Sequence, residues 1–274
     1  MERERNREFP TPQLLRIDGI AGIHYRTDAS PKGLLIYGIG APNVPDSGHL
    51  PDAPIVLNHG LDLFVPDYIG FGRSDGIFTP ENCIKTFTQL YDNFSKGCVG
   101  RNTYDNLHEE MQYDRILVVG RSLGGTYVPL LPRFNDRIKE IAIFSAVVDS
   151  KSQGSVEGEE TNKLFLDSMR EDGYHHLYRG ILEENWVRHL ENEDDLSPMD
   201  NIQYLSDVKL FIGHGRKDPI CHYSKLQRYY NQIIEKFPER KENYKMQIYE
   251  TGDHGKSTTN LAMTNFLDWL NLKR

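Results

Sequence analysis

The chain has 274 residues, enough to bury a sizeable core as one α/β domain with an insertion. Its formal net charge of −8 argues against a nucleic-acid-binding surface and a polybasic membrane contact, because both need clustered positive charge. Three cysteines without C-x-x-C spacing form neither a disulfide framework nor a zinc knuckle, and they favour a reducing compartment. No apolar run approaches membrane-spanning length, and residues 1–8 are mixed in charge, so we expect a cytoplasmic protein without a membrane span.

The first quarter of the chain predicts strands and one short helix. Two apolar runs around an Asp-Gly turn predict an antiparallel hairpin at a sheet edge over residues 14–27. Residues 34–37 are almost entirely apolar and lead into a glycine-rich loop, which is typical of a buried parallel strand. Residues 53–61 favour a short helix that ends at Gly60, and residues 63–65 predict a further strand.

The next part of the chain predicts two helices and two strands. A capping Thr79 followed by Pro80 begins a helix whose apolar residues recur at spacings of three and four. Residues 116–119 predict a strand that enters a tight turn and then a second helix, which Pro129 should kink or shorten. Residues 141–145 predict the next strand.

The composition changes at Asp149, where strand character is lost and Glu and Asp become frequent. Aromatic residues at helical spacings favour a helical insertion here, and its acidic run at residues 191–195 is interpreted as a solvated face. Strands alternating with amphipathic helices then resume, which implies a mostly parallel sheet with helices on both faces. We therefore expect an α/β core of residues 1–149 and 200–274, with residues 150–199 as a helical cap.

The sequence Gly120-Arg121-Ser122-Leu123-Gly124 places a serine on the expected strand-to-helix turn. A nucleophile on such a turn has strained backbone geometry, and side chains two residues before and after it would collide. Glycine at both positions removes the collision. The alternative is that Ser122 only caps the helix of an inactive scaffold. Arg121 is expected to make a buried contact rather than to bind a substrate carboxylate.

A serine nucleophile needs a base, and His254 is the best placed of the ten histidines, because it directly follows a predicted strand. Asp218, in the loop after the preceding strand, would hold the imidazole in the required tautomer. The chain order Ser, Asp, His is the one that this kind of sheet uses. Asp253 is an alternative acid, but it adjoins His254 in sequence and is expected to shape the turn instead.

The remaining motifs predict no cofactor and no metal. The glycines of residues 70–72 look like the start of a dinucleotide-binding loop, but Asp75 stands where the third glycine should be. His214 and His222 flank the acid loop and are interpreted as surface or loop-packing residues. The His175-His176 pair has no partner at metal-ligand spacing, so an exposed helix face is expected there.

Together these motifs resemble the α/β-hydrolase fold superfamily over nearly the whole chain, from the strand at Leu34 to the last helix. The segments that carry the resemblance are the elbow around Ser122, residues 66–74, the acid loop at residues 215–218 and the histidine loop at residues 252–255. The resemblance implies a mostly parallel central sheet flanked by helices and a Ser-Asp-His triad.

The resemblance also implies an oxyanion hole made of two backbone N–H groups. One would come from Leu123, and the other from Ile39 or the neighbouring Gly40, after the first parallel strand. Many members of the superfamily have His-Gly in this loop, where this chain has Tyr37-Gly38. A His59-Gly60 pair occurs later, but it would leave no room for a helix before the next strand, so we prefer Ile39.

The function that the resemblance implies is that of a serine hydrolase acting through an acyl-enzyme, without cofactor or metal. Ser122 would attack, His254 would serve as base, and Asp218 would orient the histidine. The capped fold suits carboxylic esters of small or medium acyl groups, so an esterase with a small-molecule substrate is the first hypothesis. A peptidase or amidase of the same fold and a non-catalytic, ligand-binding scaffold are the alternatives. The sequence is silent on oligomeric state.

Overall fold

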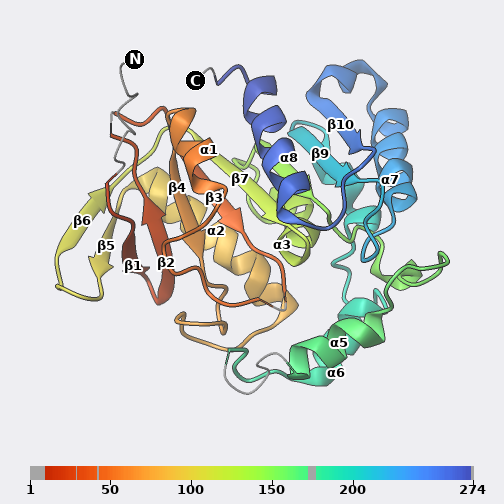
Figure 1. Cartoon of the computed structure of the whole chain (residues 1–274), viewed down its shortest axis with the longest axis horizontal. Helices are drawn as coiled ribbons and strands as arrows, with labels where there is room; N and C mark the ends of the chain where they lie inside the picture. Colours follow the sequence, from red (N-terminus) through yellow and green to blue (C-terminus); the bar gives the residue numbers. More distant parts are fainter. Residues whose placement is uncertain (1–9, 29, 42, 172–176, 273–274) are drawn as a thin grey trace, which may run out of the picture.

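The computed structural model describes residues 10–28, 30–41, 43–171 and 177–272. A ten-stranded sheet forms the centre of this part of the protein (Figure 1). Its strands are β1 (Gln13–Ile17), β2 (Ile20–Tyr25), β3 (Leu34–Gly38), β4 (Asp62–Pro66), β5 (Cys98–Asn102), β6 (His108–Met111), β7 (Ile116–Arg121), β8 (Glu140–Phe144), β9 (Lys209–Gly215) and β10 (Tyr244–Tyr249). The strand order is β10-β9-β8-β7-β3-β4-β2-β1-β5-β6.

The six strands from β10 to β4 pair in parallel, as the near-continuous apolar runs in most of them predict. The chain passes from β3 outward to β4 and later returns to the other side of β3 as β7. Because the connections after β3 and β7 leave in opposite directions, a crevice opens at the carboxyl ends of these two strands. This is the place in the sheet where an α/β protein is expected to bind its ligand.

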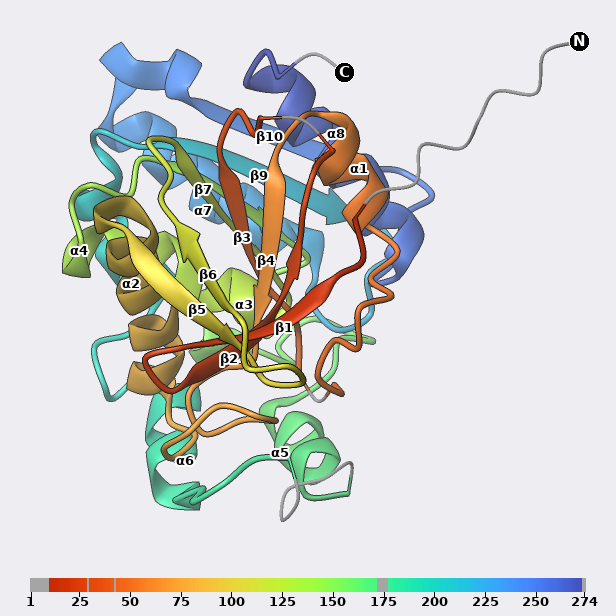
Figure 2. The same cartoon turned by 90° about the vertical axis from the view of Figure 1, so that its left-hand side faces the viewer.

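Helices cover both faces of the sheet, as the alternating pattern predicts. Figure 2 shows α1 (Ala53–Asn58) and α8 (Lys256–Trp269) on one face, where they contact each other. The other face carries α2 (Pro80–Lys96), α3 (Leu123–Tyr127), α4 (Leu131–Phe134) and α7 (Tyr223–Lys236). Thr79 caps α2, since its hydroxyl accepts the backbone N–H of Asn82 at 3.2 Å. None of the helices in the described ranges is long and apolar enough to cross a membrane.

The N-terminal hairpin is present, but the prediction that it lies at the edge of the sheet is wrong. β1 and β2 pair antiparallel as predicted, yet β1 also pairs with β5, so that Leu15 lies opposite Asn102. The β5–β6 hairpin therefore forms the edge. These two strands went unnoticed in the sequence because they are short and largely polar, as strands at an exposed edge are.

The helix after the Ser122 turn is short, as Pro129 predicts. α3 ends at Tyr127, a 3₁₀ turn follows over Val128–Leu130, and α4 resumes at Leu131. Proline removes a helical hydrogen bond and clashes with the preceding turn, which explains the break.

The chain between β8 and β9 leaves the sheet and forms helices beyond the carboxyl ends of the strands (Figure 1). These are α5 (Asn162–Glu171) and α6 (Glu183–Leu190), with 3₁₀ turns over Ser150–Ser152 and Pro198–Leu205. Trp186 of α6 stacks on Phe78 with ring centroids 4.9 Å apart, which fastens the insertion to the loop after β4. The expectation for His175 and His176 falls outside the described residues.

Candidate active site

Ser122 lies on a strained turn between β7 and α3. Its backbone has φ 52° and ψ −118°, a conformation that non-glycine residues rarely adopt. The turn is held by a hydrogen bond from the N–H of Ser122 to the carbonyl of Phe144, 2.9 Å. Such strain costs about 1–3 kcal/mol and persists where the surrounding structure enforces it. The buried strand β7 and its neighbour β8 provide that enforcement.

The glycines on either side of Ser122 are required by close backbone contacts. A Cβ at Gly120 would lie 2.3 Å from the carbonyl carbon and oxygen of Gly124. A Cβ at Gly124 would lie 2.4 Å from the carbonyl oxygen of Gly38. Backbone atoms cannot yield as a flexible side chain can. The spacing of the motif therefore has the steric cause that the sequence predicts.

His254 and Asp218 meet at the ends of neighbouring strands. The Nδ1 of His254 lies 2.8 Å from Oδ2 and 3.0 Å from Oδ1 of Asp218. Asp218 Oδ1 also accepts the backbone N–H groups of Ile220 and Cys221 at 2.9 and 3.0 Å. The Asp218 side chain is fully buried and that of His254 is 14% exposed. Parallel pairing of β9 and β10 brings the two loops together.

The environment of Asp218 keeps its carboxyl group ionised. Burial acts to raise the pKa, but the hydrogen bond with His254, its charge and that of His214 outweigh burial, so the pKa lies below its ordinary value. An ionised Asp218 accepts the Nδ1 proton of His254, which leaves Nε2 free to act as a base. Asp253, the alternative acid, is exposed, and its Oδ1 accepts the N–H of Gly255 at 2.7 Å, so it shapes the turn.

Arg121 connects the serine turn to the histidine loop. Its guanidinium donates to the backbone carbonyl of His254, a partly buried contact within the protein in place of the contact with a substrate carboxylate that was the alternative. Within the described residues the Ser122 hydroxyl makes no hydrogen bond to the His254 ring. Such bonds are often long in enzymes without substrate and shorten in the reacting complex.

The loop after β3 lies against the serine. A Cβ at Gly40 would lie 2.8 Å from Cβ and 3.2 Å from Oγ of Ser122. The hydroxyl of Tyr68 donates to the carbonyl of Ile39 at 2.6 Å and thereby fixes the loop. Leu123 is the first residue of α3, so its backbone N–H has no acceptor within the helix. Both expected oxyanion donors therefore belong to segments next to Ser122.

The alternative oxyanion segment at His59 is not a strand end. Residues 55–57 belong to helix α1, and His59 follows its last turn. The Nδ1 of His59 lies 2.6 Å from the carbonyl of Ile55, and its Nε2 lies 3.4 Å from a carboxylate oxygen of Asp268. These contacts tie His59 to the α1–α8 face of the sheet.

A cavity of about 250 Å³ adjoins Ser122. Its walls come from both the sheet loops and the segment between β8 and β9 that contains α5 and α6. The lining residues are Ala41, Ser122, Leu123, Thr126, Val147, Ser150, Gln153, Glu160, Thr161, Asn162, Phe165, Ser168, Trp186, His189, Leu190 and Ile220. This mixture of apolar walls and a few polar groups is typical of a small-molecule site.

The sequence did not single out His189, which lines the cavity. Its Nδ1 lies 2.8 Å from Asp194 Oδ2, and its ring stacks on Tyr127. The acidic run at residues 191–195 is thus not a wholly solvated face, because the Asp194 side chain is 8% exposed and paired. A turn brings this pair together five residues apart, a spacing that helical periodicity does not indicate.

Two other predicted histidines are loop-packing residues, as expected. His214 is fully buried, and its Nε2 donates to the carbonyl of Cys221 at 2.7 Å. His222 accepts the N–H of Ser224 at the start of α7. Neither histidine contributes to the cavity in the described part of the chain.

Asp218, Cys221 and His254 offer potential metal-ligand atoms within 4.8 Å of one another. Burial raises the pKa of the Cys221 thiol well above its ordinary value. In the structure the Cys221 thiol donates to the carbonyl of Ser145 at 3.5 Å, and Asp218 Oδ2 lies 2.8 Å from His254 Nδ1. The geometry fits the Asp218–His254 hydrogen bond better.

Comparison with known proteins gives a family match and many similar folds. The profile of the prolyl oligopeptidase family matches residues 103–272, a segment that contains Ser122, Asp218 and His254. No curated protein matches the chain.

Solved structures with low sequence identity share the fold. Puromycin hydrolase is 16% identical with a TM-score of 0.66, over 96% of this chain and 39% of that chain. An acylaminoacyl peptidase from Pyrococcus horikoshii is 14% identical with a TM-score of 0.66, over 96% and 40%. The esterase Pf2001 from Pyrococcus furiosus is 12% identical with a TM-score of 0.59, over 95% and 90%. These similarities show that the chain has an α/β-hydrolase fold. The chain spans less than half the length of the first two proteins.

Proposed function

Because the chain belongs to the prolyl oligopeptidase family, whose match supports a serine hydrolase activity, we propose that it hydrolyses carboxylic esters of small or medium acyl groups. The observation that carries this proposal is the strained Ser122, which lines the cavity at the crevice of the sheet. The Asp218–His254 hydrogen bond supports it, because a paired imidazole is the base that such a serine needs.

In this proposal the ester carbonyl binds beside Ser122. His254 Nε2 removes the hydroxyl proton as Ser122 Oγ forms a bond to the carbonyl carbon, and Asp218 stabilises the resulting imidazolium. The backbone N–H groups of Leu123 and Ile39 donate to the oxyanion; losing one such donor costs about a hundredfold to a thousandfold in rate.

The tetrahedral intermediate then loses the alcohol, which takes the proton from His254 as the C–O bond breaks. Water, deprotonated by His254, attacks the acyl-enzyme and releases the carboxylic acid and the free serine. The residues named in these steps perform the whole reaction without a cofactor or metal. In this scheme residues 150–199 act as a cap on a core of residues 1–149 and 200–274, and the substrate is a small molecule.

Peptide or amide hydrolysis is the second candidate. The family match favours it, since the family is named for an oligopeptidase, and the same residues can protonate an amine leaving group. Ester and amide substrates share the tetrahedral intermediate, so the triad geometry does not separate them.

A fluorophosphonate probe tests the proposal directly. We expect labelling of the native protein and none of Ser122→Ala. No labelling of the native protein, or equal labelling of the variant, would instead indicate a non-catalytic scaffold. Rates with p-nitrophenyl esters of increasing acyl length and with aminoacyl arylamides then decide between esterase and peptidase.

A further inference from the structure

His24 of β2 is a buried histidine, 1% exposed, that no step of the proposed reaction uses. A carboxylate lies near each of its ring nitrogens. Nε2 lies 3.6 Å from Asp62 Oδ2 of β4, and Nδ1 lies 3.6 Å from Glu109 Oε2 of β6. Because buried charges in proteins need partners of opposite charge, the protonation state of His24 decides whether this group is balanced.

The hydrogen bonds on the Asp62 side place a proton on Nε2 of His24. The hydroxyl of Tyr113 donates to Asp62 Oδ2 at 2.8 Å, and Asp62 Oδ1 accepts the backbone N–H of Thr27 at 2.8 Å. The hydroxyl oxygen of Tyr113 lies 3.1 Å from Nε2. Because Tyr113 already donates its proton to Asp62, its oxygen can only accept from the ring, and Nε2 must carry a hydrogen.

The Glu109 side requires a proton on Nδ1 as well. Nδ1 and Glu109 Oε2 are both buried, and neither atom makes a hydrogen bond to another residue that the structure describes. Oε1 of Glu109 pairs with the Arg26 guanidinium at 3.0 Å, which favours the ionised carboxylate, a group that only accepts. Without a proton on Nδ1, two acceptors would face each other. Both ring nitrogens therefore carry hydrogens, and His24 is a cation.

The electrostatics of the cluster agree with a charged His24. Burial acts to lower the pKa of His24, but Asp62 and Glu109 outweigh it, so the pKa lies above its ordinary value. Burial acts to raise the pKa of Asp62 and of Glu109, and the hydrogen bond with His24 is the largest of the interactions that outweigh it. Among the described residues the titratable groups beside His24 are these two carboxyls and the Tyr113 hydroxyl, with Arg26 paired to Glu109. Loss of the His24 proton leaves two carboxylates with Arg26 as the remaining cation.

The cluster joins strands that are not neighbours in the sheet. In the strand order β1 and β5 lie between β2, which carries His24, and β6, which carries Glu109. The pairing of β5 with β1 covers two residue pairs, so the backbone ladder that joins the β5–β6 hairpin to the rest of the sheet is short. Tyr113, two residues after the end of β6, also contacts His24. Side chains from and just beyond β6 thus fasten the hairpin to the sheet through this one histidine.

We propose that protonated His24 is a pH-sensitive clasp that holds the β5–β6 hairpin against the sheet. The imidazolium bridges Asp62 of β4 and Glu109 of β6. Once the Nδ1 proton is lost, the Glu109 carboxylate faces the bare nitrogen and the negative charge of Asp62, so the hairpin detaches more readily. The clasp is independent of the hydrolysis proposed above.

The direction of the pH effect follows from linkage. In an unfolded chain the pKa of histidine is about 6.5, and in the folded chain that of His24 lies higher. The clasp is therefore at full strength below about pH 6.5 and is lost as the pH rises through the folded pKa of His24. Within that window the opening equilibrium of the hairpin should grow by about tenfold for each pH unit.

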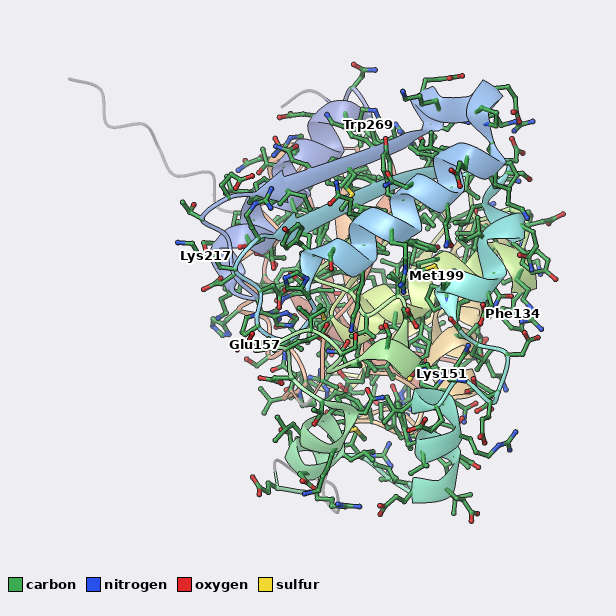
Figure 3. All side chains as sticks on the ribbon, turned by 90° about the vertical axis from the view of Figure 1, so that its right-hand side faces the viewer. Phe134, Lys151, Glu157, Met199, Lys217 and Trp269 are labelled. Carbon is green, nitrogen blue, oxygen red and sulfur yellow. The ribbon has the colours of Figure 1, made fainter. Side chains whose placement is uncertain are left out.

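Two NMR measurements on the native chain test the clasp. The ring signals of His24 should titrate above pH 6.5, the ordinary value of about 6.5 being the reference. Amide exchange, corrected for its intrinsic rate at each pH, should show the protection of β5 and β6 falling as His24 loses its proton. Amides of β9, near the other edge of the sheet with α7 packed against it (Figure 3), report the opening of the core. Hairpin amides should exchange faster than these, because the hairpin opens while the core stays folded.

Substitutions in β6 separate the clasp from other effects of pH. Glu109→Gln should lower the pKa of His24 and remove most of the pH dependence of hairpin exchange. Glu110→Gln removes the same charge one residue later, and His108→Gln removes the histidine one residue earlier; both side chains are exposed, so both variants should keep the native pH dependence.

Several results would overturn the clasp, and the native chain alone supplies three of them. These are a His24 that titrates at or below about pH 6.5, hairpin protection that is constant while His24 titrates, and hairpin protection equal to that of β9. The fourth is a folded Glu109→Gln variant with the native pH dependence, or a Glu110→Gln variant that loses it to the same degree. None of these measurements uses enzymatic activity, so they stand whether or not ester hydrolysis is found.

Discussion

Replacing Asp218 by Asn tests the part assigned to the buried acid. The two side chains have the same shape, so the introduced amide can keep its oxygen facing the N–H groups of Ile220 and Cys221, which lie 2.9 and 3.0 Å from Oδ1 of Asp218. The amide NH₂ then takes the place of Oδ2, which lies 2.8 Å from His254 Nδ1. Two donors cannot share a hydrogen bond, so the ring must move its proton to Nε2.

A histidine with its proton on Nε2 cannot accept the proton of Ser122. In the serine protease template the same substitution lowers kcat by about 10⁴-fold, and we expect a loss of this size in kcat for Asp218→Asn. The assay is hydrolysis of a p-nitrophenyl ester, with circular dichroism as the check on folding. Slow labelling by the fluorophosphonate probe should accompany the loss, because that reaction also needs the base.

Asp253→Asn is the matched control, because Asp253 neighbours His254 in sequence and lies at the surface. We expect its rate to change by about twofold or less, as is usual for exposed substitutions. The reasoning is refuted if folded Asp218→Asn keeps about a tenth or more of the activity, or if Asp253→Asn loses more than Asp218→Asn.

Three further predictions concern the residues around the site. A Cβ at Gly124 would lie 2.4 Å from a backbone carbonyl oxygen of β3, so Gly124→Ala should lower the free energy of unfolding in urea by about 1–3 kcal/mol; unchanged stability contradicts the steric account. Arg121→Met removes the donor to the His254 carbonyl and should lower kcat/KM by about tenfold to a hundredfold through misplacement of the base. An unchanged rate would mean that other contacts hold that loop. Lys225→Met removes the cation that faces the buried carboxylate of Glu159 and should cost about 3–5 kcal/mol of stability, less when Glu159→Gln is added. Equal losses in the single and double variants would exclude coupling of the pair.

Local sequence determined the elements of the core and the identity of the candidate residues. Ser122 could be recognised from the sequence because a side chain two residues before or after it would collide with the backbone, so the five-residue motif has glycine at both places. Strand runs, the Thr79 cap and the break at Pro129 follow from short-range preferences in the same way. The order of Ser122, Asp218 and His254 along the chain then predicted which loops carry the site.

Tertiary structure alone decided which side chains pair across the fold. The β5–β6 hairpin at the sheet edge consists largely of polar residues, and it is the pairing of β5 with β1 that makes it part of the sheet. His189 and Asp194 meet through a turn, and Gln153 donates both to Glu160 in its own loop and to Ile220 in the loop after β9. Contacts of this kind depend on where each loop leaves the sheet, which short-range patterns do not encode. For the same reason sequence could not tell that Glu159 is buried against Lys225 while Glu160, one residue later, lines the cavity beside Ser122 without a partner among the described residues.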